Sequence, residues 1–307
     1  MSATDEHADR FTLLRPLLFT IAYEILGSAT EADDVLQDSY LRWAAVDLAE
    51  VRDTKAYLAQ LVTRQSLNTL RAEARRREDY IGPWLPEPLL LDARDASEDV
   101  VLAESVSMAM LVVLETLSPD ERAVFVLREV FGFSHDEIAT AISKSAAAVR
   151  QMAHRAREHV QSRRRRFEPV DPQQSVQITT QFLTAAATGD VKGLMAMLAP
   201  DVVFTSDSDG KVSAARRPVL GAEKVARFIV GLMRQAGPEY RIEPAVYNSA
   251  PALVVYQGDR PDSVITVDFI DGQITNFYAM RNPEKLGSVT VRREISRSGG
   301  VSRTNRW

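Results

Sequence analysis

The sequence contains no cysteine, and this absence excludes a disulfide framework, thiolate metal sites and a cysteine nucleophile. Histidine is also scarce, with four residues among 307. Two of them, His154 and His159, are five positions apart and would not share one face of a helix, so we expect no metal site. The sequence also lacks a glycine-rich loop that could hold a phosphate group, and we expect no cofactor.

Long apolar runs are missing as well. No run approaches the length that a bilayer crossing requires, and the first ten residues, Met1–Arg10, are polar and acidic, unlike a signal peptide. Together with the absence of cysteine, these features predict a soluble, cytoplasmic protein that has no membrane partner.

Charge is distributed unevenly along a chain whose length and globular composition predict two or three domains. The net charge is −5, but five arginines against one acidic residue occupy 64–77, and seven against one occupy 150–166. Between them, nine acidic residues and one arginine occupy 86–121. A basic stretch is usually a solvated helix face, but two basic stretches joined by an acidic connector indicate two contacts with a polyanion such as DNA.

The N-terminal third has helical periodicity. Apolar residues spaced three and four apart predict two helices within 11–43 that are joined at Gly27, and a third helix over 55–78 with one basic face. Three prolines then fall between Gly82 and Pro88, which excludes a helix and predicts a linker at a domain boundary.

A helix-turn-helix follows the acidic connector. Ser118–Glu121 and Ser134–Glu137 are capping sequences that start two helices, and a turn at 143–145 precedes a long third helix from Ala146. We expect Ala147, Val149 and Ala153 to pack against the second helix. The opposite face presents residues suited to the major groove, because Arg and Gln make bidentate contacts with base edges. These candidate DNA-binding residues are Arg150, Gln151, His154, Arg155 and Arg157.

The last third has an α+β pattern. We expect helices over 175–188 and 191–198, and strands over 202–205, 252–256, 263–270 and 274–279. Asp271-Gly272 separates the last two strands, as in a tight hairpin turn. Residues 292–307 are rich in Arg, Ser and Gly without periodicity, and we expect them to be disordered.

Two of these segments resemble the sigma-70 family. Residues 33–43 (DDVLQDSYLRW) resemble the helix of these factors that binds core RNA polymerase, and residues 144–157 (KSAAAVRQMAHRAR) resemble the promoter-reading helix of their fourth conserved region. The resemblance implies two partners, core RNA polymerase and promoter DNA. It implies that Asp34, Gln37 and Asp38 contact the clamp helices of the largest subunit, and that region 4 contacts the flap of the second-largest subunit. It also implies that residues 44–78 open and read the minus-ten element, with a separated strand held by Trp43, Tyr57, Arg64, Asn68 and Arg71.

Two further motifs, at 84–88 and 282–286, resemble the extracytoplasmic-function (ECF) subgroup with a fused SnoaL-like C-terminal domain, the SigJ-type factors; the glycine-rich motif of that subgroup is present only as Asp209-Gly210-Lys211, preceded by Ser208. The matching residues, to which the resemblance assigns a regulatory role, are Trp84, Leu85, Pro86, Glu87 and Pro88; Asp209, Gly210 and Lys211; and Asn282, Pro283, Glu284, Lys285 and Leu286. The resemblance implies a multidomain fold in which two all-α sigma domains precede an α+β cone. The expected boundaries are 1–82 for region 2, 83–106 for the acidic linker, 107–167 for region 4, 172–290 for the cone and 291–307 for the tail.

The fused domain is expected to regulate the factor itself and to replace a separate anti-sigma factor. A tethered domain has a high effective concentration, so a weak interface can hold the DNA-binding regions in a compact form. One hypothesis is that the acidic linker shields the Arg-rich helices or occupies cationic channels of the polymerase.

Two other classes of protein stay open at this point. SnoaL-like cones include enzymes that place an Asp or His base in an apolar pocket, but all four histidines lie outside the cone, and Asp201 and Asp268 are ordinary surface or turn candidates. We therefore expect no enzymatic activity. The second alternative is a one-component regulator that binds an operator through the helix-turn-helix and a small ligand in the C-terminal pocket.

Overall fold

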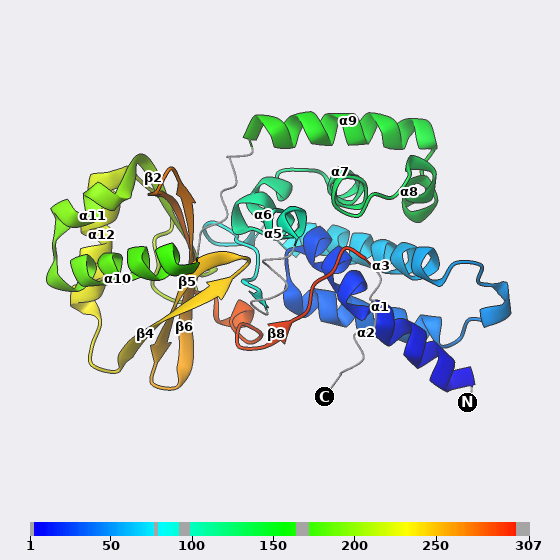
Figure 1. The fold of residues 1–307 in the computed structure, drawn as a ribbon, viewed down its shortest axis with the longest axis horizontal. Helices are drawn as coiled ribbons and strands as arrows, with labels where there is room; N and C mark the ends of the chain where they lie inside the picture. Colours follow the sequence, from blue (N-terminus) through cyan, green and yellow to red (C-terminus); the bar gives the residue numbers. More distant parts are fainter. Residues whose placement is uncertain (1–2, 77–78, 92–98, 164–171, 299–307) are drawn as a thin grey trace.

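The computed structural model describes residues 3–76, 79–91, 99–163 and 172–298. Figure 1 shows two bodies side by side, one made of helices from the first half of the chain and one built around a β-sheet. We call them the helical body and the C-terminal domain.

The N-terminal helical unit consists of three helices, as the periodicity predicts. They are α1 (Ala3–Leu26), α2 (Ala29–Trp43) and α3 (Thr54–Arg76), with the short 3-10 helix η1 (Leu48–Glu50) between α2 and α3. The join between α1 and α2 is tight because Gly27 adopts a left-handed φ of 72°, and the Ser28 hydroxyl then accepts from the Glu31 N–H as the N-cap of α2.

The helix-turn-helix unit also has the predicted punctuation. Ser118 caps its first helix and Ser134 forms a complete capping box with Glu137 at the start of the second. Ser143 ends that second helix in the left-handed region, with φ 56°. The elements are α5 (Val100–Ser105), α6 (Met108–Leu114), α7 (Pro119–Phe125), a π-helical turn η3 (Val126–Val130), α8 (His135–Ile142) and α9 (Ala146–Arg163).

The two helical units share one continuous hydrophobic core, which includes Leu18 of α1, Leu58 of α3 and Val149 of α9. Helix α3 packs against α7 and α8, while α9 lies outermost (Figure 1). The two units that the sequence predicts to contact different parts of a promoter therefore lie directly against each other.

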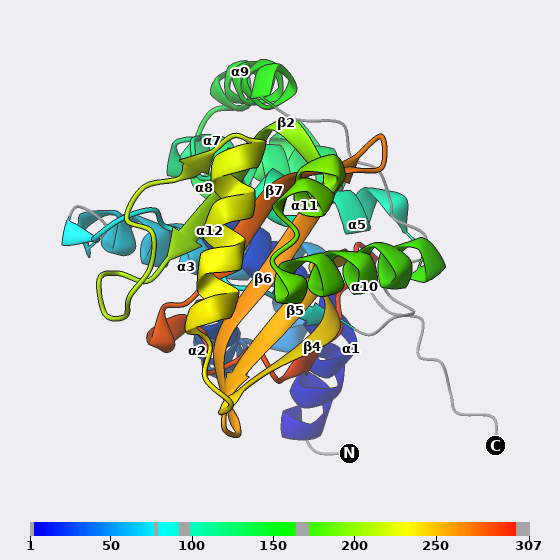
Figure 2. The ribbon, with the colours of Figure 1, turned by 90° about the vertical axis from the view of Figure 1, so that its left-hand side faces the viewer.

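The C-terminal domain is a mixed sheet with helices on one face. In Figure 2 the helices α10 (Pro172–Thr188), α11 (Val191–Met197) and α12 (Ala222–Gln235) lie in front of the sheet and the helical body lies behind it. The strands are β2 (Leu198–Asp207), β3 (Val219–Leu220), β4 (Tyr240–Tyr247), β5 (Ala250–Gln257), β6 (Arg260–Ile270) and β7 (Gln273–Met280). The predicted helices and strands are present, and Asp271 and Gly272 form the hairpin turn with φ values of 51° and 74°.

The sequence analysis did not predict α12, β3 or β4. Strand β4 contains Pro244, which pairs opposite Leu253, and a proline weakens the sequence signal for a paired strand.

Both faces of the sheet are buried. On the helix side, Phe182, Phe204 and Phe277 pack together within a cluster that also includes α12 residues. On the opposite side, a second cluster joins Val254 and Met280 of the sheet to Met108 of α6. The sheet is thus packed onto the helical body by an apolar contact.

Two short strands from outside the domain extend its sheet. The linker supplies β1 (Leu90–Leu91), which pairs antiparallel with β4, and the tail supplies β8 (Arg292–Arg293), which pairs parallel with β1. Ile295 is buried in the core of the helical body. The expectation of disorder is therefore wrong for residues 292–298, while residues 299–307 lie outside the described residues.

Candidate polymerase and DNA surfaces and the junction behind them

The candidate polymerase-binding residues lie together on α2. Asp34, Gln37 and Asp38 are exposed, on the side of the helix opposite its buried residues Val35 and Leu36. Leu41 follows at the next turn of the same face and is 64% exposed. An acidic and amide face that ends in an exposed leucine offers both polar and apolar contacts to a partner, and the sequence analysis missed Leu41.

The linker fixes the start of α2 through Glu87. One carboxylate oxygen accepts from the N–H groups of Ala29 and Thr30 at 2.9 and 3.0 Å, and the other accepts from the Ser28 hydroxyl at 2.8 Å. The first N–H groups of a helix have no partner within it, and its positive end favours an anion. The glutamate of the WLPEP motif is thus a buried cap for the candidate polymerase-binding helix.

Among the candidate minus-ten residues, Trp43 is a correction. Its side chain is fully buried, its indole N–H donates to the His7 carbonyl at 2.9 Å, and its ring packs against Tyr57 with 5.7 Å between centroids. A ring in this position belongs to the core and is not available to stack on a base. Tyr57 is half-buried and Asn68 is exposed, so both stay predictions.

The two candidate arginines of α3 contact the helix-turn-helix unit. The Arg64 guanidinium donates to the carbonyls of Thr140 and Ala141 at 2.8 and 3.1 Å, at the C-terminal end of α8. A cation at this end satisfies carbonyls that the helix leaves unpaired. Arg71 pairs with Asp120 at 2.6 Å. Both arginines are therefore turned toward protein rather than toward a nucleic acid.

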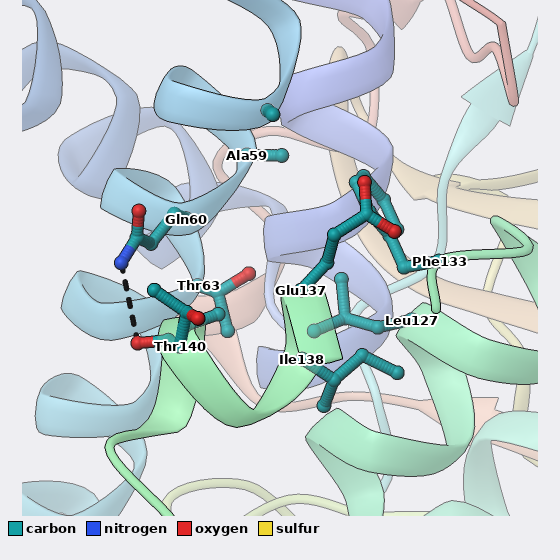
Figure 3. A pocket seen from close by; sticks show the side chains of 10 residues that line it. Ala59, Gln60, Thr63, Leu127, Phe133, Glu137, Ile138 and Thr140 are labelled. Carbon is teal, nitrogen blue, oxygen red and sulfur yellow. Dashed lines mark hydrogen bonds between the residues drawn. The ribbon is translucent and has the colours of Figure 1, made fainter. Parts of the chain in front are cut away.

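The contact between α3 and α8 is incompletely packed. A groove of about 160 Å³ lies between them, lined mainly by alanines and by Leu127, Phe133 and Ile138. Figure 3 shows Gln60 reaching across it to donate to the Thr140 carbonyl, at 3.2 Å. The groove is open to solvent, so part of the apolar surface of α3 and α8 stays uncovered beside their contact.

The candidate recognition helix α9 presents its predicted polar face outward. Arg150, Gln151, His154 and Arg155 are exposed, and Val149 and Ala153 are buried as predicted. Ala147 is exposed, so its predicted packing is wrong.

Two arginines of α9 are held by acidic residues of the same unit. Arg155 pairs with Glu121 at 3.1 Å and Arg157 pairs with Glu129 at 2.6 Å. Hydrogen bonds from the Ser118 hydroxyl and from Arg155 lower the pKa of Glu121, and the hydrogen bond to Glu129 raises the pKa of Arg157. These pairs fix the direction of two candidate DNA-binding side chains.

The three motifs with an expected regulatory role meet at a junction around Asp207, at the end of β2. This fully buried carboxylate accepts from the Leu85 N–H at 2.7 Å and pairs with Lys285 at 2.8 Å. It also accepts from the Tyr80 hydroxyl, which itself accepts from the Asn282 amide at 2.9 Å. We call these groups the Asp207 junction.

The positive charge of Lys285 is compensated at the Asp207 junction by a carboxylate, a backbone carbonyl and an aromatic ring. The Lys285 ammonium also donates to the Leu85 carbonyl at 2.7 Å and lies 3.8 Å from the centre of the Trp84 ring, within cation–π range. Burial and the neighbouring Asp207 carboxylate raise the pKa of the Tyr80 hydroxyl, so this group stays a neutral donor. Removing one partner of such a buried pair would leave an uncompensated charge.

The Asp209–Lys211 motif lies at the rim of this junction. Asp209 accepts from the Ile81 N–H at 3.1 Å and pairs with Lys211, which also pairs with Glu284. These contacts lower the pKa of Asp209 and raise the pKa of Lys211. Gly210 has a φ of 65°, and a Cβ there would lie 3.2 Å from the Ile81 side chain, so glycine suits this close approach.

A second junction surrounds Asn248, in the turn between β4 and β5. Its side chain is fully buried and joins three parts of the chain: it accepts from the Leu89 N–H at 2.8 Å, and donates to the Tyr23 hydroxyl at 2.7 Å and to the Val106 carbonyl at 2.8 Å. Tyr23 in turn donates to the Glu87 carbonyl at 2.8 Å. The turn thus binds α1, the linker and the start of the helix-turn-helix unit at one point.

A buried carboxyl group, Glu24, lies beside a buried arginine where α1 meets the helix-turn-helix unit. The fully buried Glu24 accepts from the Ser105 hydroxyl at 2.8 Å, and burial raises its pKa to about 8. Next to it, Arg122 donates to the Glu24 carbonyl at 2.9 Å and pairs with Glu115. A carboxyl group in this environment is stable mainly in its protonated form.

Asp207 and Asn248 were missed by the sequence analysis. The resemblance identified their neighbours, but no local pattern distinguishes a buried Asp at a strand end from an exposed one. The Asn248-Ser249 pair between two apolar runs did offer a turn signal, since Asn tolerates the left-handed φ of 52° found here.

Two absences apply to the described part of the chain. No group of three or more His, Asp or Glu side chains is arranged to hold a metal ion within it. None of its helices combines the length and apolar character that a bilayer crossing requires.

Comparisons with known proteins agree with this architecture. Residues 11–76 match the model of Sigma-70 region 2, and residues 107–160 match the model of Sigma-70, region 4. These matches cover α1–α3 and α6–α9, and they define the helical body as that of a sigma-70-type factor.

Full-length relatives narrow the family. The chain is 34% identical to the ECF RNA polymerase sigma factor SigJ of Mycobacterium tuberculosis (strain ATCC 25618 / H37Rv) over 96% of this chain and 98% of that protein. It is 28% identical to the protein named Probable ECF RNA polymerase sigma factor SigI of strain CDC 1551 / Oshkosh, over 93% and 97%. The crystal structure of M. tuberculosis SigJ matches 92% of this chain and 98% of its own, with a TM-score of 0.70 and 33% identity. The chain therefore belongs to the ECF RNA polymerase sigma factors, with two helical sigma domains followed by an α+β domain.

Proposed function

We propose that the observed structure is the polymerase-free, closed state of this sigma factor, and that the C-terminal domain holds it closed. The observation that carries the proposal is that the basic face of α3 is bound to the helix-turn-helix unit itself, through Arg64 and Arg71. The two guanidinium groups would have to leave these partners to hold a DNA strand.

The geometry of a promoter supports this interpretation. Elements centred near positions −10 and −35 are about 25 base pairs apart, or roughly 85 Å at 3.4 Å per base pair. The units that would contact them pack directly against each other here, with 2.8 Å between an Arg64 nitrogen and the Thr140 oxygen. Binding both elements therefore requires the two units to separate.

We assign the polymerase contact to the exposed face of α2, where Asp34, Gln37, Asp38 and Leu41 would meet the clamp helices. The major-groove contact is assigned to Arg150, Gln151, His154, Arg155 and Arg157 of α9. Contact of the helix-turn-helix unit with the flap is part of the same proposal. The exposed face of α2 points outward in the closed state, so the first encounter with polymerase can precede the separation of the two helical units.

We assign the C-terminal domain a holding role and not a catalytic one. Its two junctions, at Asp207 and Asn248, bind the linker and α1 through buried polar groups. The cavity between α10 and the sheet measures about 10 Å³, because phenylalanine rings fill the space, whereas ligand pockets usually measure about 300–1,000 Å³. A domain of this kind takes the place of a separate anti-sigma factor in the cytoplasm, where polymerase works.

The test uses full-length protein with Asp120→Asn. This change removes the pair with Arg71 at the contact between α3 and the helix-turn-helix unit, and the pair with Lys144 within that unit, without altering any proposed polymerase- or DNA-binding residue. Partly exposed pairs contribute about 1 kcal/mol, so we expect an approximately fivefold shift toward the open state. Asp136→Asn, at an exposed position of α8, is the matched control.

The readouts are energy transfer between dyes on α2 and α9, affinity for core polymerase, and initiation in vitro. The proposal predicts a larger inter-dye distance and tighter core binding for Asp120→Asn only. Equal distances and affinities for both variants would refute the closed state as an inhibitory one. DNA binding that is independent of core polymerase would favour the one-component regulator instead.

A further inference from the structure

The C-terminal segment, residues 292–298, has the features of a bound peptide. It begins as β8, which adds a parallel strand to the edge of β1. Addition of a strand to a sheet edge is a common way to bind extended peptides, in which the backbone gives affinity and alternate side chains give specificity.

Alternate side chains of the C-terminal segment face the helical body. Arg293 pairs with Asp33 of α2 at 2.5 Å and lies near the face of the Phe19 ring. Ile295 is buried in the helical core, and Arg297 pairs with Asp99 at 2.6 Å. Period-two contacts of this kind are typical of an extended segment with one specific face.

The site that receives the C-terminal segment is composite. Asp33 belongs to the N-terminal unit, as does Thr20, whose hydroxyl accepts from the Ser296 N–H at 3.0 Å. Asp99 caps α5, and the Val130 carbonyl, which accepts from Arg297 at 3.3 Å, ends the π-helical turn before α8. The complete site exists only while these separate parts of the chain lie together.

We propose that residues 292–298 are an intramolecular peptide ligand that reads and stabilises the closed state, and that this binding competes with binding of polymerase. The competition rests on the proposed function, whereas the binding itself does not. Asp33 lies one helical turn before Gln37, so the C-terminal segment borders the proposed polymerase face of α2. The segment follows the domain by only a few residues, so its high local concentration allows individually weak contacts to suffice.

The test is charge reversal at Arg293 in the full-length chain. Arg293→Glu places an anion beside Asp33, and we expect a fivefold or larger increase in the exchange of the Ser296 and Leu91 amides, by the scale of a partly exposed pair. Glu294→Arg, at an exposed position of the same segment, is the control and leaves exchange unchanged. Arg293→Gln, which removes the charge without adding repulsion, gives a smaller effect in the same direction.

Rescue makes the test specific. Asp33 also pairs with Arg15 at 3.1 Å, so the rescue combines Asp33→Arg with Arg293→Glu and Arg15→Glu. This variant restores both ion pairs and recovers exchange protection to within about twofold of wild type. No loss of protection in either Arg293 variant would overturn the inference, even if Asp120→Asn opens the molecule as proposed. A second outcome would separate the two proposals. If the Arg293 variants lose amide protection but bind core polymerase with unchanged affinity, and Asp120→Asn changes neither the inter-dye distance nor that affinity, the peptide site would stand and the proposed function would be refuted.

Discussion

Substitution of Asn248 by alanine tests whether the C-terminal domain is energetically coupled to the sigma regions. The side chain makes three buried hydrogen bonds, to Leu89, Tyr23 and Val106, which belong to three separate parts of the chain. Alanine would remove all three while keeping the residue small, so no steric clash complicates the result.

The expected cost follows from these contacts. Each lost hydrogen bond is worth about 1 kcal/mol, and the buried Leu89 N–H left without an acceptor adds roughly 1–3 kcal/mol. Asn also suits the left-handed φ of 52°, where alanine is strained by roughly 1 kcal/mol. The sum is about 5–7 kcal/mol, which corresponds to a shift of roughly several thousandfold or more toward separated domains.

The assay is amide exchange in the full-length chain, followed at α1, β1 and β5, together with urea denaturation. Asn248→Ala should lose protection at β1 and at the N-terminal unit together, whereas Gln235→Ala, at an exposed position of α12, should change neither. A change smaller than about 0.5 kcal/mol, or a loss of protection confined to the β4–β5 turn, would refute the coupling that we infer.

Three further predictions concern single side chains. Because burial raises the pKa of Glu24 to about 8, the folded state keeps a proton that the unfolded chain releases near pH 4.5. The free energy of unfolding therefore falls as the pH rises from about 4.5 to about 8. Glu24→Gln should remove this pH dependence in urea titrations at pH 5 and 8. Trp43→Phe should lower the free energy of unfolding by about 1 kcal/mol through the lost hydrogen bond to the His7 carbonyl. Opening of promoter DNA by the folded variant should be unchanged; slower opening would show that Trp43 stacks on a base after all. Arg150→Ala should weaken promoter binding by about 1–3 kcal/mol and relax specificity at one position, and an equal loss on all sequences would assign Arg150 to a phosphate instead.

Local signals predicted much of the helical body. The N-cap at Ser118, the capping box at Ser134 and the glycine join at Gly27 are determined by residues only a few positions apart, and all three are present. The Asp271-Gly272 hairpin belongs to the same class. Asp34, Gln37 and Asp38 of α2 were identified by the resemblance to sigma-70 factors; all three are exposed, and their contact with polymerase stays a prediction.

The remaining features depend on contacts between distant residues. Trp43 could have faced a base or the core from its sequence alone, and only the packing of α1 and α3 around it decides that it is buried. Arg293 and Ile295 look like members of a polar tail until the edge of β1 and the Asp33 carboxylate are placed beside them. Asp207 is 122 positions from Leu85, a distance over which no periodicity carries information.

Energy transfer between dyes on α2 and α9, before and after addition of core polymerase, measures whether the free protein is closed. We predict a short distance in the free protein and an increase to several tens of ångströms in the complex with polymerase and promoter, as elements roughly 85 Å apart require. A long distance in the free protein, or an unchanged short distance in an initiating complex, would contradict this prediction.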